Sequence, residues 1–185
     1  QWQVALQNEA DYFFILLGTN DAKPENWDPD RYKRDYLTMI RNISATHPHS
    51  QIVLGIPPPL LQDGRFGVSK SLMNMEVPLV IREVAEKAGL AHEPVDMFPL
   101  FGGSTNTDQA LYLDGCHPNE RGHEKTSSQL SETFSQTIVA TEAEAPSKQT
   151  DRAALSKLYQ NCAWNYGQLL DYNCPGHYDA PVTCS

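Results

Sequence analysis

The stretch DYFFILLGTND, residues 11–21, decides the fold. Its apolar run is short and ends at Gly18, and turn-forming residues follow directly. A run of this kind predicts a buried β-strand that ends in a sharp turn. A continuous apolar strand is typical of a parallel sheet that helices cover on both faces.

The rest of the chain alternates between helix and strand. Apolar residues recur with helical spacing in three segments and form short runs in two others. Asp28 or Asp30 is expected to cap the first helix, and Gly89 to end the second. The expected helices are residues 29–45, 75–90 and 119–140, the further strands are 51–57 and 92–98, and the loops include 60–74 and 99–118. This order predicts an α/β fold in which helices cover both faces of a parallel sheet.

Two polar motifs follow the first and third expected strands. One is GTND, residues 18–21, and the other is DGCHPNERGH, residues 114–123. Right-handed crossovers place the carboxyl ends of parallel strands at one edge of the sheet, where open α/β folds bind their ligands. We therefore expect these two motifs, which are far apart in the sequence, to meet at one site.

Asp114 and His117 have the spacing of a base and the carboxylate that orients it. Across a turn that contains glycine, a carboxylate three residues before a histidine can reach the near ring nitrogen. Such a contact fixes the tautomer of the ring and stabilises the imidazolium that forms when the ring accepts a proton, as in acyl-transfer triads. The alternative is a plain surface turn in which Asn119 caps the following helix.

The GTND motif offers groups that suit an oxyanion hole. Gly18 lets the chain turn sharply at the end of the strand, and Asn20 provides an amide donor at that position. Asp21 is expected to tie the loop through hydrogen bonds to backbone groups. The alternative for this motif, taken alone, is an Asx-turn without a catalytic role.

Together, the two motifs resemble the SGNH, or GDSL-type, esterase and acylhydrolase superfamily. The resemblance covers residues 1–140 and is carried by Gly18, Asn20 and Asp21 in its GxND block and by Asp114 and His117 in its DxxH block. It implies a partial flavodoxin-like three-layer α/β/α sandwich and hydrolysis of a carboxylic ester through an acyl-serine, without a cofactor. It also implies that His117 is the general base, that Asp114 orients it, and that Asn20 lies in the oxyanion hole.

The serine nucleophile of that superfamily is absent from its expected place. The superfamily carries this serine in a GDS block before GxND, whereas the residues before Gly18 contain no serine. Ser69, Ser71 and Ser104 occur in expected loops and are poorly placed to replace it. We expect the C-terminal part of a hydrolase domain whose serine lies outside this chain. The alternative is an inactive scaffold or recognition domain in an extracellular assembly.

The expected sheet is incomplete, because the first strands of the superfamily fold are missing as well. A sheet of this kind should expose a wide apolar face, which a protein segment from before residue 1 or from another chain would cover.

Composition and charge exclude several other classes of function. The chain has 185 residues, of which 40% are hydrophobic, and a formal net charge of −9. An acidic surface repels phosphate groups, so neither nucleic acid nor an anionic membrane is an expected partner. No apolar run reaches the roughly 20 residues that a transmembrane helix needs. His123 and Glu124 do not combine with the DxxH block into a common metal-ligand spacing, so no metal site is expected. The expected partner is an ester-bearing small molecule or glycan.

The composition changes after residue 140. Residues 141–150 are small and polar and predict a linker, and residues 151–185 predict a Cys-rich extension. Cysteines this dense, without CxxC spacing, indicate disulfides in a secreted or extracellular protein. The extension is similar to the N-terminal cap of extracellular leucine-rich repeats; the alternative is a disulfide-tied tail. The disulfide candidates are Cys116, Cys162, Cys174 and Cys184, although Cys116 equally suits a packed side chain, and Asn42 in Asn-Ile-Ser is the glycosylation candidate.

Overall fold

The computed structural model describes residue 7 and residues 9–144, with side chains described as far as residue 135. The chain divides into two compact units between Gln136 and Thr137, and all side-chain contacts given below lie in the first unit. The predicted Cys-rich extension, residues 151–185, and residues 145–150 of the predicted linker lie outside the described residues. Both assignments therefore stay predictions.

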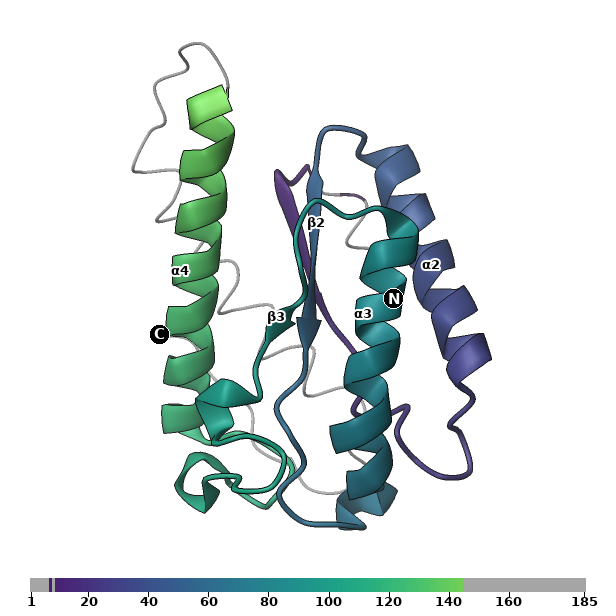
Figure 1. The fold of residues 1–185 in the computed structure, drawn as a ribbon, viewed down its shortest axis with the longest axis vertical. Coiled ribbons are helices and arrows are strands. Elements are labelled where there is room, and N and C mark those ends of the chain that lie inside the picture. The colour runs from purple at the N-terminus through teal and green to yellow at the C-terminus, as the bar shows by residue number, and fades with distance from the viewer. Residues whose placement is uncertain (1–6, 8, 145–185) are drawn as a thin grey trace. The chain divides into compact units, whose positions relative to one another are not determined.

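The described part of the chain contains one parallel sheet of three strands (Figure 1). Tyr12 pairs with Gln51 and Leu16 with Gly55, and Gly55 also pairs with Val95 on the next strand. The strands are β1 (Tyr12–Leu16), β2 (Gln51–Ile56) and β3 (Val95–Asp96), with β2 in the centre. The predicted parallel sheet is confirmed.

Three long helices accompany the sheet within the described residues, and shorter helical turns lie in the loops. The long helices are α2 (Pro29–Thr46), α3 (Val77–Ala88) and α4 (Glu120–Glu144). The shorter turns are Arg65–Gly67, Leu72–Glu76, Pro99–Phe101 and Gln109–Leu111.

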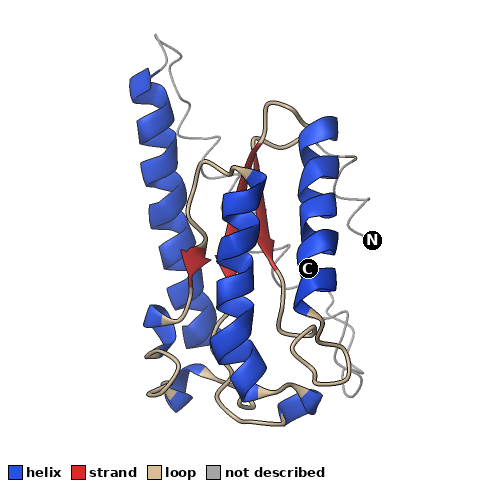
Figure 2. Cartoon of the chain, turned by 45° about the vertical axis from the view of Figure 1, so that its right-hand side comes forward, coloured by secondary structure: helices blue, strands red, loops and turns tan. Residues whose placement is uncertain are grey.

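The helices form a layer on each face of the sheet (Figures 1 and 2). Leu54 of β2 belongs to a buried cluster with Ile40 of α2 and Ile81 of α3. Its neighbour Val53 points to the opposite face and belongs to a second cluster with Phe134 of α4. Burial on both faces explains why β2 has no polar side chain after Gln51, and the expected α/β/α layering is confirmed.

Both predicted helix ends have the expected chemistry. Oδ1 of Asp28 accepts the backbone N–H groups of Asp30 and Arg31 at 3.1 and 2.9 Å, so Asp28 rather than Asp30 caps α2. Gly89 ends α3 with φ of 64°, a conformation that glycine adopts without strain.

The predicted loop 60–74 is wrong at its carboxyl end, because the helical turn Leu72–Glu76 leads directly into α3. Asn74 in this turn is buried. Its Oδ1 accepts the backbone N–H of Leu60 at 2.7 Å, and its Nδ2 donates to the carbonyl of Leu60 at 3.1 Å. A buried amide bonded to a distant backbone leaves no trace in hydrophobic periodicity, which explains the error.

Two other element ends differ from the prediction. Strand β3 ends at Asp96, well inside the expected segment 92–98, because Oδ1 of Asp96 accepts the N–H of Phe98 at 2.9 Å and turns the chain. Helix α4 runs to Glu144 and so includes the first four residues of the predicted linker. Glutamate and alanine dominate those residues, and both favour helix.

The predicted wide apolar face is not exposed among the described residues. Strand β1 lies at one edge of the described sheet, yet Tyr12 and Phe14 are half-buried. Their rings lie edge-on to Phe134 of α4, with ring centroids 5.4 and 6.2 Å away. At this edge only Leu17, just after β1, is a large exposed hydrophobic residue among those described.

Gly18 should tolerate a side chain poorly. Its φ is 133°, and an added methyl group would lie 2.8 Å from Cγ1 of Val77 and 3.0 Å from the hydroxyl of Tyr32. We expect Gly18→Ala to lower the free energy of unfolding by about 2 kcal/mol or more, because backbone strain and steric overlap add. Urea unfolding monitored by circular dichroism measures the loss.

Gly89→Ala is the matched control for this prediction. Its φ is 64°, and nothing lies within 4 Å of an added methyl group. It should cost about 1 kcal/mol from the backbone alone. Equal losses for the two variants would contradict a packing role for Gly18.

Candidate active site

Asp114 and His117 form a hydrogen-bonded pair in the turn before α4. Oδ2 of Asp114 lies 2.8 Å from Nδ1 of His117. Oδ1 of the same carboxylate accepts the backbone N–H groups of Cys116 and His117 at 3.0 and 2.8 Å. Gly115, with φ of 86°, allows the chain to turn between them. One carboxylate thus fixes both the backbone of the turn and the imidazole ring.

The surroundings of Asp114 favour its ionised form. Partial burial by itself raises the pKa of this carboxyl group. The hydrogen bonds from the backbone and ring of His117 and from the backbone of Cys116 outweigh that effect and hold the pKa below its ordinary value of 3.8. An ionised Asp114 accepts a proton-bearing Nδ1, which leaves the lone pair of the neutral ring on Nε2. This is the tautomer that a general base requires.

Asn119 caps α4 directly behind this pair. Its Oδ1 accepts the backbone N–H of Gly122 at 3.2 Å, and its Nδ2 donates to the carbonyl of Ala110 at 2.9 Å. Its backbone N–H donates to the carbonyl of Leu111 at 2.9 Å. The helix cap and the Asp114–His117 pair are therefore both present, and the cap fixes the backbone at the point where the turn ends.

The GTND motif forms a compact turn at the end of β1. The N–H groups of Asp21 and Ala22 both donate to the carbonyl of Gly18 at 3.1 Å. Asn20 is exposed, and among the described residues no hydrogen bond engages its side-chain amide. Although Asp21 is exposed as a residue, crowding of its carboxyl group by protein atoms raises the pKa of Asp21, and its own N–H and then Arg31 oppose that rise. Asn20 is thus the donor of this motif that remains available.

Two tyrosines of α2 hold the end of β1 where the motif begins. The hydroxyl of Tyr32 donates to the carbonyl of Leu17 at 3.0 Å, and that of Tyr36 donates to the carbonyl of Ile15 at 3.3 Å. The two rings meet edge to face, with centroids 5.4 Å apart. The start of the GTND turn is therefore anchored to a helix.

The loop 57–69, between β2 and α3, contacts both motifs. On one side, the N–H of Ser69 donates to the carbonyl of Ala22 at 2.8 Å. On the other side, the N–H groups of Leu61 and Gln62 donate to the carbonyl of Gly115 at 3.1 Å. The turns that follow β1 and β3 thus lie at the carboxyl edge of the sheet and are bound to one intervening loop.

Phe66 is a site residue that the sequence prediction missed. Its ring centroid lies 5.1 Å from that of His117. Phe66 has φ of 54°, and its neighbours Gly64 and Gly67 also have positive φ. A left-handed conformation costs a side-chain-bearing residue about 1–2 kcal/mol, so the surrounding contacts hold Phe66 in place. The signal in the sequence is the pair of glycines that encloses an arginine and an aromatic residue.

Cys116 and His123 lie beside the pair. Cys116 is half-buried and packs against the cluster formed by β1, β2, α2 and α3. The other disulfide candidates, Cys162, Cys174 and Cys184, lie outside the described residues, so any disulfide stays a prediction. His123 lies on α4, and burial and then the imidazole of His117 lower the pKa of His123.

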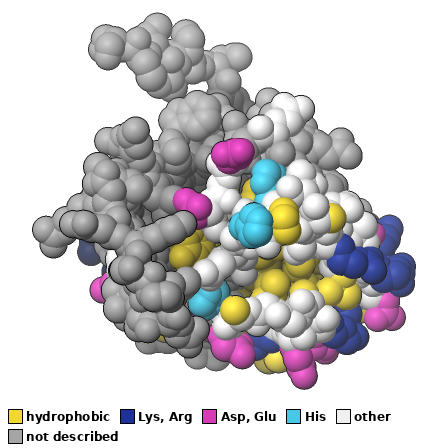
Figure 3. Space-filling view, turned by 90° about the horizontal axis from the view of Figure 1, so that it is seen from above, with side chains coloured by type: hydrophobic (Ala, Val, Ile, Leu, Met, Phe, Trp, Pro, Cys, Tyr) yellow, Lys and Arg dark blue, Asp and Glu magenta, His cyan; other side chains and the backbone are white. Residues whose placement is uncertain are grey.

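Two further histidines of the described residues, His47 and His92, lie at the opposite end of the sheet. Figure 3 shows histidine side chains between hydrophobic and acidic groups on this face. His47 packs its ring on Phe13, and Nε2 of His92 lies 2.7 Å from Oε1 of Gln51. Within the described ranges, no three His, Cys, Asp or Glu side chains gather as metal ligands would. In the same residues, no helix combines the length and apolar character needed to cross a membrane.

Comparison with known proteins identifies the family. The model of the GDSL-like lipase/acylhydrolase family matches residues 1–125. This range includes the GTND motif and the Asp114–His117 turn. The chain therefore belongs to the GDSL-like lipase/acylhydrolase family.

One curated relative is an esterase. An acetylxylan esterase from Xylanibacter ruminicola is 29% identical over 142 residues, which are 67% of this chain and 28% of that protein. The chain thus spans little more than a quarter of the curated relative that it matches.

Solved structures share the fold at low identity. A peptidoglycan O-acetylesterase matches with a TM-score of 0.61 and 21% identity, over 71% of this chain and 39% of that one. A carbohydrate esterase of family 3 from Talaromyces cellulolyticus matches with a TM-score of 0.53 and 21% identity, over 74% and 62%. These similarities confirm the predicted SGNH-like α/β fold.

The ionised Asp114 should stabilise the folded chain in a pH-dependent way. Because the pKa of Asp114 is lower in the folded chain than its ordinary value of 3.8, the stabilisation is present above that value and is lost as pH falls through the folded-state pKa. Asp114→Asn should therefore lower the free energy of unfolding at pH 7 by less than about 1 kcal/mol, since the pair is partly exposed and water screens it. Urea unfolding between pH 7 and 3 measures the difference, which should shrink below pH 3.8.

Asp108→Asn is the matched control, because Oδ1 of Asp108 accepts the N–H of Ala110 in a similar turn. If the difference in free energy of unfolding between the wild type and Asp114→Asn grew as pH falls, that result would contradict the ionised pair.

Proposed function

We propose that this chain carries the base and oxyanion groups of a carboxylester hydrolase. In this proposal His117 is the general base, Asp114 orients it, and Asn20 donates a hydrogen bond to the oxyanion. Gly18 and Asp21 support the loop that presents Asn20. The observation that carries the proposal is the 2.8 Å contact between Oδ2 of Asp114 and Nδ1 of His117, since this contact holds Nε2 ready to accept a proton.

The chemistry needs a serine hydroxyl beside Nε2 of His117. The serine oxygen attacks the ester carbonyl carbon while its proton passes to Nε2. Asn20 then stabilises the negative charge on the former carbonyl oxygen. The alcohol leaves with the proton from His117. Water then attacks the acyl-serine while His117 takes its proton, and the acid is released as that proton passes from His117 to the serine oxygen. Neither step requires a cofactor or a metal ion.

A serine outside residues 1–185 supplies the nucleophile in this proposal. Ser69 ends the loop that contacts both motifs and Ser71 follows it, and their hydroxyl groups form a hydrogen bond with each other at 2.9 Å. In the described sheet β1 has a neighbouring strand on one side only, and a protein segment carrying the serine would pair with its other side. A parallel strand there would bring the loop that follows it to the carboxyl end of the sheet, where the site lies. The segment would come from the same protein or from a partner chain.

The substrate class follows from the relatives. An acetylxylan esterase and a peptidoglycan O-acetylesterase are named for removing acetyl groups from polysaccharides. We therefore propose an O-acetylated glycan as the substrate. This substrate agrees with a secreted protein, whose disulfides would involve the Cys-rich extension 151–185 after the linker. Asn42 lies exposed on α2, where a glycan would not disturb the core.

Substitutions at the proposed site should distinguish the role of Asp114 from that of Asn20. In the protein with its complete natural chain, Asp114→Asn should lower kcat on an acetylated xylo-oligosaccharide by about 10⁴-fold, because the tautomer of His117 is no longer fixed. Asn20→Ala should lower kcat by about 10²–10³-fold, through loss of one oxyanion donor. Released acetate gives the rates.

His123→Gln is the control, since it removes a neighbouring imidazole that the proposal does not use, and it should keep most of the activity. Labelling with a fluorophosphonate identifies the serine. A wild-type protein that releases no acetate and takes no label would overturn the proposal and favour the inactive scaffold.

A further inference from the structure

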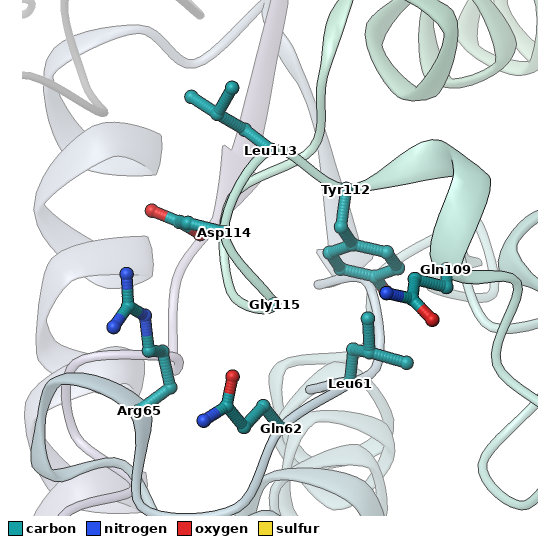
Figure 4. A pocket seen from close by; sticks show the side chains of 8 residues that line it. All are labelled: Leu61, Gln62, Arg65, Gln109, Tyr112, Leu113, Asp114 and Gly115. Atoms are coloured by element: carbon teal, nitrogen blue, oxygen red, sulfur yellow. The ribbon is translucent and has the colours of Figure 1, made fainter.

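A cavity of about 300 Å³ lies directly beside the Asp114 turn. Its walls come from the loop 57–69 and from the segment that leads into the turn (Figure 4). The polar side chains in these walls include Arg65, Gln62, Gln109 and Asp114. The cavity therefore adjoins the proposed catalytic pair through Asp114 and is lined largely by polar groups.

Arg65 is the cationic group of this cavity. In Figure 4 its guanidinium and the amide of Gln62 both extend toward the space beside Gly115 and Asp114. Nε of Arg65 is buried and has no hydrogen-bond partner. Among the described residues, the ion pairs involve Lys33, Arg82 and His117 but not Arg65. Nε is itself too buried for a ligand to reach, but among the described residues no hydrogen bond or ion pair engages the guanidinium, so its terminal nitrogens remain available to a ligand.

The position of Arg65 is coupled to the catalytic pair. Its guanidinium carbon lies 4.6 Å from the centroid of the Phe66 ring, and the same ring lies 5.1 Å from the imidazole of His117. Phe66 stays in this place despite its left-handed backbone, between Gly64 and Gly67. The Phe66 ring would therefore separate a ligand group bound by Arg65 from the proposed general base, His117.

We propose that this cavity binds the carboxylate of a charged sugar unit in the glycan substrate. The inference rests on the proposed function and names a substrate subclass for it. The planar guanidinium binds carboxylates through paired, charge-assisted hydrogen bonds. The amides of Gln62 and Gln109 offer both donors and acceptors, which suit sugar hydroxyls.

Asp114 is the one acidic side chain in the cavity wall. Its two oxygens already accept the backbone N–H groups of Cys116 and His117 and contact Nδ1 of His117. These contacts offset part of its charge and leave Arg65 as the group that selects the ligand. The net charge of the whole chain is −9, so the protein as a whole repels anions. Binding of a carboxylate in this cavity would therefore depend on Arg65 itself.

Direct binding tests the proposal without any need for the serine. The probes are a xylo-oligosaccharide that carries one glucuronic acid and the same compound after carboxyl reduction, titrated calorimetrically into the full chain. The charged probe should bind about tenfold more tightly than the reduced probe, and added salt should weaken only the charged one. A second arm compares a muramic-acid disaccharide with its carboxyl-reduced form, which distinguishes a uronic acid from a lactyl ether as the carboxylate source. Preference for the charged form in either arm supports the proposal.

Arg65→Gln should abolish the preference for the charged probe, and Arg65→Lys should restore part of it. Arg41→Gln is the matched control, because Arg41 is exposed on α2, which contributes nothing to the cavity wall. Equal binding of charged and reduced probes in both arms, or a preference that survives Arg65→Gln in a folded variant, would overturn the proposal. Charge-selective binding without ester hydrolysis would count against the proposed function alone, and hydrolysis without charge selection would count against the cavity alone.

Discussion

The carboxylate of Asp114 is the group on which the site depends, because one of its oxygens binds the backbone of the turn and the other binds the imidazole ring. Oδ1 accepts two backbone N–H groups and so defines the turn that ends at His117. Oδ2 holds Nδ1 of the imidazole. The local fold of the turn and the orientation of the ring are therefore one constraint, and a change that breaks the turn also releases the base. The same hydrogen bonds keep the pKa of Asp114 low, so the carboxylate stays ionised near neutral pH.

The parallel sheet brings this turn to its partners. Because β1, β2 and β3 run in the same direction, the loops that follow them share one edge. The central loop 57–69 then binds the GTND turn through Ala22 and the Asp114–His117 turn through Gly115. It also places Phe66 against His117 and Arg65 in the neighbouring cavity. This loop, whose regular structure is limited to the short helical turn Arg65–Gly67, thus determines how the two motifs are spaced and what surrounds His117.

Much of this arrangement follows from the sequence, and the remainder has identifiable causes. Apolar runs and Gly18 predict the parallel sheet, and the spacing of Asp114 and His117 predicts their contact. The sequence does not reveal Phe66 or Arg65, because their position depends on glycines that permit left-handed backbone rather than on any periodicity. It also misplaces the start of the helical turn before α3, which the buried amide of Asn74 stabilises through a backbone fourteen residues away.

The central claim is that Asp114 fixes the tautomer of His117. Nitrogen-15 NMR of the histidine rings at neutral pH tests it most directly, since the shifts of Nδ1 and Nε2 report which nitrogen carries the proton. We predict a protonated Nδ1 and an unprotonated Nε2 in His117, and a loss of this preference in Asp114→Asn. A His117 ring that carries its proton on Nε2, or one whose tautomer is the same with and without the Asp114 carboxylate, would contradict the account.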